Sequence, residues 1–145
     1  MAVQSRIVRA WSPEDHLTLK QKIRARQLIS APSLDSLINE GAFERITIYQ
    51  VVQMEIHNEK LRQGEQDYTV MVIEGYADTG EQIALSTSSE SFMEDIFDII
   101  GQIEEEAAEL LSFTVSVKSL KSKNNSGYFY KAYIEDLQYK EDEVL

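Results

Sequence analysis

One stretch of the sequence combines cationic and aromatic side chains at close spacing. Residues 116–134, SVKSLKSKNNSGYFYKAYI, carry four lysines, three tyrosines and no acidic residue. Ammonium groups bind phosphate oxygens, and flat rings stack on nucleobases with a gain of about 1–3 kcal/mol per base. These side chains, gathered around one turn, are typical of a surface that binds single-stranded nucleic acid with little sequence preference.

Charge is distributed unevenly along the chain. The formal net charge is −11, yet residues 1–30 hold six basic and two acidic residues, whereas residues 88–111 hold eight acidic residues and no basic one. Exposed charges farther apart than a Debye length of roughly 8–10 Å are largely screened from one another. A local basic patch can therefore attract a polyanion even though the whole chain is acidic.

Composition excludes several classes of protein. With 145 residues, of which 43% are hydrophobic, the chain can bury one core, so we expect one globular domain. Cysteine is absent and only two histidines occur, so we expect no disulfide, no thiol nucleophile and no metal site. Because the motifs in the sequence include no accepted catalytic signature, we also expect no cofactor and no enzymatic activity. No apolar run reaches the 18 or so residues that span a bilayer, and the N-terminus lacks the apolar stretch of a signal peptide. We therefore expect a cytoplasmic protein without a membrane partner.

The elements that would position the basic stretch are mainly strands. Residues 68–77 are apolar on both faces, as in a strand buried on two sides, and a turn at 78–80 leads to a strand over 81–87. The strand expected at 112–120 directs Phe113, Val115 and Val117 inward, and another follows at 127–137. Residues 43–57 alternate, which predicts a strand with Ile46, Ile48, Val52, Met54 and Ile56 on one face and Arg45, Thr47, Tyr49, Gln53, Glu55 and His57 on the other.

One main helix separates these strands. Apolar residues recur at helical spacing between 92 and 103, after two possible capping boxes, Thr87 with Glu90 and Ser91 with Glu94. Residues 13–30 fit either a helix or a turn followed by a strand. Three strands, a helix and two strands are the order of the OB-fold, a five-stranded Greek-key barrel with a helix between strands 3 and 4. We expect a basic arm at 1–21, the OB-fold domain at 22–137 and an acidic tail at 138–145.

The chain also resembles a known family between residues 22 and 134. It has a Ser-Leu-x-x-Leu turn before the first barrel strand, an acid-Thr-Gly turn, a serine-rich helix start followed by Phe and Ile-Ile, and a lysine-rich turn before an aromatic strand. In these features it is similar to the small OB-fold single-stranded-DNA-binding proteins of bacteriophages and conjugative plasmids. The resemblance implies a non-enzymatic protein that coats single-stranded DNA during replication or transfer.

The candidate binding residues come from the expected barrel face and its loops. In residues 128–135, Phe129, Lys131 and Tyr133 share the face expected to be wetter, although each ring could instead be a barrel residue. RNA or duplex DNA as the ligand stays open. The full candidate set is Arg45, Tyr49, Lys60, Arg62, Tyr68, Lys118, Lys121, Lys123, Tyr128, Phe129, Lys131 and Tyr133.

Other functions and partners also fit parts of the sequence. The chain could be an acidic adaptor that binds protein, with the lysines serving only solubility. Asp78-Thr79-Gly80 and Ile99-Ile100-Gly101 resemble aspartic-protease signatures, but the first triplet stands where a hairpin turn is needed and the second lies in a helical repeat. We expect self-association through the N-terminal arm, to which Trp11 could contribute, and possible recruitment of replication or transfer proteins by the tail.

Overall fold

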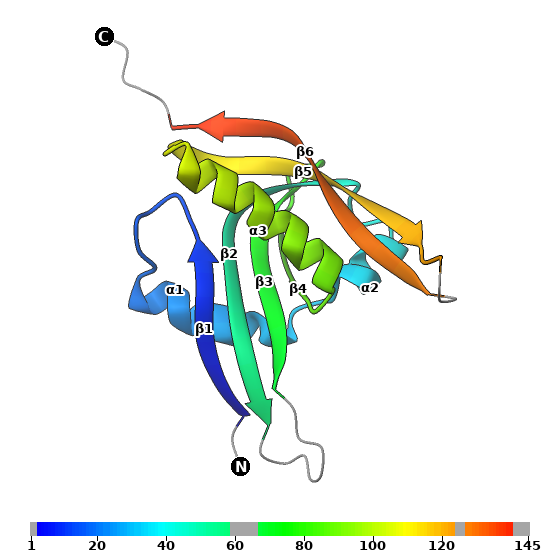
Figure 1. Cartoon of the computed structure of the whole chain (residues 1–145), viewed down its shortest axis with the longest axis horizontal. Coiled ribbons are helices and arrows are strands. Elements are labelled where there is room, and N and C mark those ends of the chain that lie inside the picture. Colours follow the sequence, from blue (N-terminus) through cyan, green and yellow to red (C-terminus); the bar gives the residue numbers. More distant parts are fainter. Residues whose placement is uncertain (1–2, 59–66, 124–126, 141–145) are drawn as a thin grey trace.

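The structure is a computed structural model that describes residues 3–58, 67–123 and 127–140. Its six strands form one antiparallel open sheet in the order β4-β3-β2-β5-β6, with β1 paired to β2 (Figure 1). The predicted mainly-β class is confirmed, and so is the order of elements from β2 to β6. The elements are β1 (Val3–Trp11), α1 (Leu19–Gln27), the 3-10 helix η1 (Leu28–Ser30), α2 (Leu34–Asn39), β2 (Arg45–Asn58), β3 (Tyr68–Ala77), β4 (Gln82–Thr87), α3 (Glu90–Glu105), β5 (Leu110–Lys121) and β6 (Tyr128–Tyr139).

Strand β2 is the centre of the sheet because it pairs with three other strands. Strand β3 follows one edge of β2 from Ile46 to Ile56. The other edge is shared: β5 pairs with residues 45–48 and β1 with residues 51–58. Strands β5 and β1 therefore occupy successive stretches of the same edge of β2.

A β-bulge in β2 reverses the side of the sheet toward which the apolar residues of this strand point. Ile48 pairs with Gly75 and Gln50 pairs with Glu74, so a step of two residues on β2 matches one residue on β3. Tyr49 is therefore the extra residue. Ile46 and Ile48 consequently lie in the core cluster that includes α3. Val52, Met54 and Ile56 lie in a second cluster with residues of α1 and η1. The prediction that all five share one face is wrong, because regular alternation ends at the bulge.

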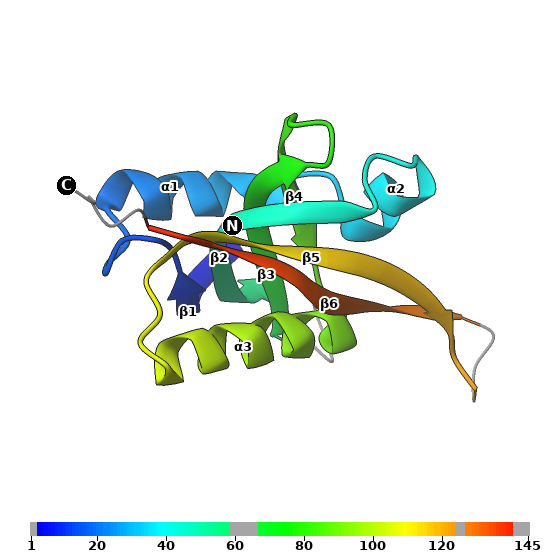
Figure 2. The same cartoon turned by 90° about the horizontal axis from the view of Figure 1, so that it is seen from above.

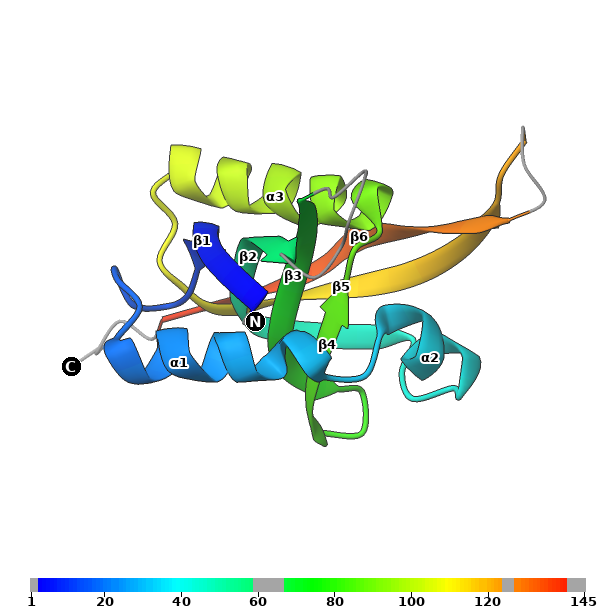
Figure 3. The ribbon, with the colours of Figure 1, turned by 90° about the horizontal axis from the view of Figure 1, so that it is seen from below.

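The two clusters place helices on opposite faces of the sheet. Helix α3 covers one face and α1 covers part of the other, so β2 and β3 are buried between them (Figures 2 and 3). Val70 and Val72 of β3 belong to the α1 cluster, and Met71 and Ile73 belong to the α3 cluster. This confirms that β3 is a strand buried on both sides.

Other parts of the chain form hydrogen bonds with the free edges of β4 and β6. At β4, the Ser86 amide donates to the carbonyl of Pro32 (3.0 Å), and the Ser86 hydroxyl donates to that of Ala31 (3.0 Å). At β6, Ser91 Oγ donates to the carbonyl of Tyr130 (2.9 Å), and Asp95 Oδ2 accepts from the amide of Ala132 (2.9 Å). Because unpaired strand edges invite aggregation, these contacts protect the fold.

The start of α3 differs from the predicted capping boxes. The N-cap residue is Ser89, and no side chain caps this end by a hydrogen bond. The Thr87 hydroxyl accepts from the amide of Ser89 (3.1 Å), and Ser91 bonds to β6. Both predicted capping hydroxyls are therefore used in tertiary or turn contacts, and both boxes are wrong.

The N-terminal segment is part of the body rather than an arm. Strand β1 pairs with β2 along its length, and its basic side chains contact acids of the same chain: Arg6 with Glu55 (2.6 Å) and Arg9 with Glu104 (3.6 Å). Residues 19–27 are helical, which resolves the open choice for residues 13–30, and a capping box joins Thr18 and Gln21.

The remaining predicted segments are placed as follows. Residues 138–139 belong to β6, while 141–145 of the expected tail lie outside the described residues. Asp78-Thr79-Gly80 forms the β3–β4 turn, where Gly80 has a φ of +90° and donates its amide to Ala77 (2.8 Å). Among the described residues, no helix combines the length and apolar character needed to cross a bilayer.

Replacing Gly75 by alanine tests the close contact of β2 and β3 at the bulge. A Cβ at Gly75 would lie 2.3 Å from the backbone oxygen of Thr47, so the strands would have to separate. We expect Gly75→Ala to lower the free energy of unfolding by about 1–3 kcal/mol in urea denaturation. Gly127→Ala is the control, because no atom lies within 4 Å of its added Cβ. Equal stabilities of the two variants would contradict this account.

Candidate nucleic-acid interface

One face of the sheet carries a row of polar, cationic and aromatic side chains. We call the face opposite α3 the outer face. Directly paired residues of antiparallel strands lie on the same face, and so do residues two apart along a strand. Thr114, Ser116, Lys118 and Leu120 of β5 therefore share the outer face, while Phe113, Val115 and Val117 are buried in the α3 cluster as predicted. At about 3.4 Å per residue, the row along β5 is about 20 Å long.

Two tyrosine rings lie at one end of the outer face. Tyr76 is paired with Thr47 and 43% exposed, and its ring centroid is 5.4 Å from that of Tyr49. The bulge turns Tyr49 toward this position, and Gln82 Nε2 donates to its hydroxyl (2.6 Å). Partial burial raises the pKa of Tyr49, so this ring is an uncharged phenol at neutral pH. The pair offers a fixed aromatic surface with an exposed ring.

Cations occupy the middle and far part of the same face. Arg45 is paired with Ser116, which in turn is paired with Tyr133, so these three side chains form one row across β2, β5 and β6. The Arg45 guanidinium is 3.6 Å from Glu135. Because its side chain is still 62% exposed, Arg45 can exchange this carboxylate for another anion.

Lys118 and Lys131 lie directly opposite each other on β5 and β6. Asp95 Oδ1 accepts from Lys131 Nζ at 2.7 Å, and this hydrogen bond raises the pKa of Lys131. Among the described residues, Lys118 has no carboxylate within ion-pair distance. Only Lys131 of the two facing lysines has a carboxylate partner among the described residues, so the pair retains a positive charge that an anion would stabilise.

Strand β6 turns Phe129, Lys131 and Tyr133 toward the outer face and Tyr130 and Ala132 toward the core. Tyr130 and Ala132 are buried in the α3 cluster, whereas Tyr133 is 46% exposed and Phe129 is half-buried on the outer face. The Tyr130 hydroxyl donates to Asp35 of α2, which fastens the β5–β6 hairpin to the body. Burial, with this hydrogen bond, raises the pKa of Tyr130 to about 12.

The structure brings six of the predicted residues together and leaves the others elsewhere. Arg45, Tyr49, Lys118, Phe129, Lys131 and Tyr133 share the outer face. Lys121 and Tyr128 are paired on the opposite face of the hairpin, and Lys123 follows β5. Tyr68 lies at the start of β3 beside acids that include Glu90 and Glu94, away from this set. Lys60 and Arg62 lie outside the described residues.

The sequence did not reveal Tyr76 as a candidate. The strand over 68–77 is apolar enough to predict burial on both faces, and this holds for its centre. Helix α1 covers the outer face of β3 as far as Glu74, whose carboxylate accepts a hydrogen bond from Arg24 Nε at 2.8 Å. Tyr76 lies beyond this point and is therefore exposed. Its place next to the β3–β4 turn was the only signal in the sequence.

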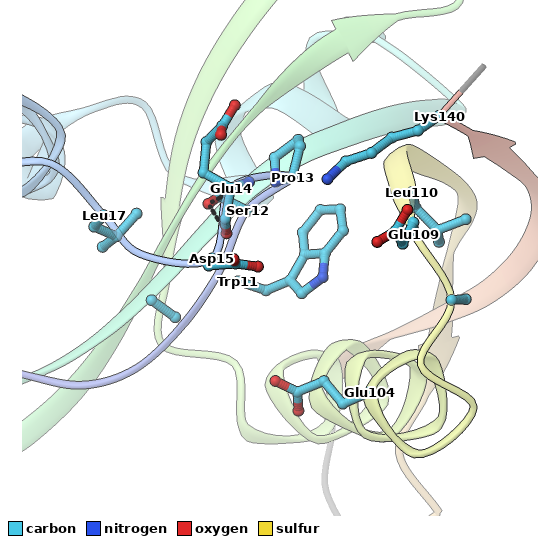
Figure 4. Close-up of a pocket in the computed structure, with 12 residues that line it drawn as sticks. Trp11, Ser12, Pro13, Glu14, Asp15, Leu17, Glu104, Glu109, Leu110 and Lys140 are labelled. Atoms are coloured by element: carbon cyan, nitrogen blue, oxygen red, sulfur yellow. Dashed lines mark hydrogen bonds between the residues drawn. The ribbon is translucent and has the colours of Figure 1, made fainter. Parts of the chain in front are cut away.

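The hollow around Trp11 is not part of this interface. Trp11 is 9% exposed, packs edge-on against Phe113 and lines a cavity of about 240 Å³. Four carboxylates and one lysine surround that cavity, and the indole forms its floor (Figure 4). A phosphate would be repelled there, and the buried ring is a core residue rather than a platform for a base.

Comparison of the chain with protein-family models, with curated proteins and with solved structures finds no match. The chemistry of the outer face must therefore be judged from its own residues. The outer face holds two exposed tyrosines, Tyr76 and Tyr133, the half-buried rings of Tyr49 and Phe129, and three cations along an open strip. Such a strip can bind an extended polyanion with flat groups.

Replacing Tyr130 by phenylalanine tests the attachment of the hairpin. The folded state holds the phenol proton more tightly than the unfolded chain, whose tyrosine pKa is about 10. The stabilisation by this contact is therefore complete below about pH 10 and is lost as the pH rises to about 12. We expect Tyr130→Phe to cost about 1 kcal/mol at pH 7 and less at pH 11, measured by urea denaturation. Tyr139→Phe, at an exposed position, is the control. Parallel pH profiles of Tyr130→Phe and the wild type would contradict the contact.

Proposed function

We propose that this chain is a non-enzymatic single-stranded DNA-binding protein that uses the outer face of its sheet. The observation that carries the proposal is the convergence of Tyr49, Tyr76 and Tyr133 with Lys118 and Lys131 on one open face. Exposed rings supply stacking that does not depend on base identity, and the cations contact phosphates. The resemblance to phage and plasmid proteins suggests coating of single strands during replication or transfer.

We also propose that the sheet is a variant of the OB-fold. The pairings β4-β3-β2-β5-β6 correspond to those of a five-stranded Greek-key barrel before its last pair of strands closes. In chain order, helix α3 stands between β4 and β5, the third and fourth strands of such a barrel. It forms hydrogen bonds with the free edge of β6 through Ser91 and Asp95. The additional strand β1 and helix α1 then cover part of the outer face, which leaves the hairpin side for the ligand.

A titration with oligo-dT at two salt concentrations tests the function. We expect binding at low salt that weakens with a log–log slope of about −0.7 for each phosphate contacted. Oligo-dA should bind with similar affinity, because stacking tolerates any base. Matched RNA and duplex DNA compare the other possible ligands. No binding of any oligonucleotide at low salt would refute the proposal.

The alternative is an acidic adaptor that binds protein. It is supported by the acidic surface of α3 and by an apolar groove beside β6, lined by residues such as Ile103 and Leu137. The oligonucleotide titration separates the two, because an adaptor of net charge −11 has no reason to bind DNA. Recruitment of further proteins by the tail would be compatible with either function.

Tyr76→Ala tests the stacking surface. Loss of one stacked base costs about 1–3 kcal/mol, so we expect binding of oligo-dT to weaken roughly 5- to 150-fold in a fluorescence anisotropy titration. Tyr76→Phe should keep most of the affinity because the ring remains. Tyr139→Ala is the matched control: this tyrosine is also exposed but lies beside α3. Equal losses in both alanine variants would argue against the outer face as the site.

Asp95→Asn tests the facing lysines. The asparagine oxygen can still accept from the amide of Ala132, while the charge that holds Lys131 is removed. We expect oligo-dT to bind several-fold tighter, with the salt slope steeper by about 0.7 because one more phosphate is contacted. Asp98→Asn makes the same change in net charge at an exposed position of α3. If it has the same effect, the gain comes from net charge and not from Lys131.

A further inference from the structure

The β5–β6 hairpin has a second surface that the proposed DNA site does not use. We call the surface formed by Ser119, Lys121, Lys123 and Tyr128 the hairpin end. It presents the ring of Tyr128, which is 67% exposed, together with the ammonium groups of Lys121 and Lys123. No carboxylate in the described part of the chain forms an ion pair with either lysine. The hairpin end thus combines free positive charge with exposed apolar surface.

A groove with the opposite charge lies between α3 and β6. Its walls are largely apolar and include Ile99, Ile103, Ile134 and Leu137, with Glu106 at the rim. The volume is about 310 Å³, which is at the lower end of the 300–1,000 Å³ range of pockets that take small ligands. The groove can therefore receive one or two large side chains.

The helix that forms one wall of this groove, and the turn after it, are rich in acidic residues. Residues 90–109 hold eight acidic residues and no basic one. Of these eight, only Asp95 and Glu104 form ion pairs with bases among the residues that the structure describes. Glu106 lines the groove and Glu105 precedes it, and neither forms an ion pair among the described residues, so a cationic partner would gain at this end of the helix.

The hairpin end cannot reach this groove within one molecule. The hairpin projects at one end of the protein, whereas the C-terminal end of α3 and the end of β6 lie at the other (Figures 1, 2 and 3). A surface that binds a different surface of an identical molecule forms a head-to-tail contact, which repeats into a ring or a filament. Each added copy would again present a free hairpin end and a free groove.

We propose that the hairpin end of one copy docks into the groove between α3 and β6 of a second copy. Tyr128 supplies its ring for the groove, and Lys121, which is on the same face of the hairpin, contacts Glu106. The outer face of each copy stays free in this arrangement. The contact joins protein to protein, and it does not depend on whether the outer face binds DNA.

Sedimentation velocity of the full chain without nucleic acid tests the assembly. We expect association that grows with protein concentration at about 0.1 M salt, where the Debye length is about 10 Å, and that weakens at about 1 M salt, where it is about 3 Å. At the lower salt, the long-range repulsion between two acidic molecules is already screened, while contacts at the interface are not. A wild-type chain that stays monomeric at every concentration would overturn the proposal.

Exchanging the charges identifies the two surfaces. Lys121→Glu and Glu106→Lys should each weaken association several-fold, and an equimolar mixture of the two variants should recover it. Lys20→Glu and Glu81→Lys make the same charge changes at exposed positions away from both surfaces and should have no effect. Circular dichroism confirms that each variant is folded. A wild type that associates while Lys121→Glu and Glu106→Lys leave it unchanged, or a mixture that does not recover, would overturn the assignment.

Discussion

The extra residue at Tyr49 is the constraint on which the arrangement of this protein depends. Without it, the apolar residues of β2 would all face one side, and only one helix layer could cover the strand. With it, Ile46 and Ile48 pack toward α3 while Val52, Met54 and Ile56 pack toward α1. The same bulge places the ring of Tyr49 beside Tyr76, so the feature that divides the core also builds one end of the outer face.

The bulge further determines which part of the outer face is open. Helix α1 covers the half of β2 beyond the bulge, where Arg24 forms a hydrogen bond with Glu74 and this bond raises the pKa of Arg24. The half before the bulge pairs with β5, and Arg45, Thr47 and Tyr49 on its outer side are exposed or only partly buried. The uncovered strip can therefore stay polar and aromatic, because burial there is not needed for the core.

Local patterns predicted the strands and the main helix well, and long-range contacts account for the failures. The inward set Phe113, Val115 and Val117 followed from alternation, and β5 has no extra residue there. The bulge was missed because the alternation of 43–57 looks continuous in the sequence. Strand β1 was missed because Arg6 and Arg9 suggest a solvated arm, whereas Glu55 and Glu104 neutralise them across the fold. Sequence spacing showed the lysines of the candidate site, but only the register showed which of them face the same way.

The separation of charge explains how an acidic chain could bind a polyanion. The eight acidic residues of 90–109 belong to α3 and the turn after it, on the other side of the sheet from the outer face. Exposed charges that are separated by more than a Debye length of roughly 8–10 Å are largely screened by dissolved salt, so most of these carboxylates repel a ligand on the outer face only weakly. Asp95 is the exception, because it reaches around the edge of β6 to Lys131. Its two hydrogen bonds hold the edge strand against the helix, so the same carboxylate that stabilises the fold also reduces the positive charge of the candidate site.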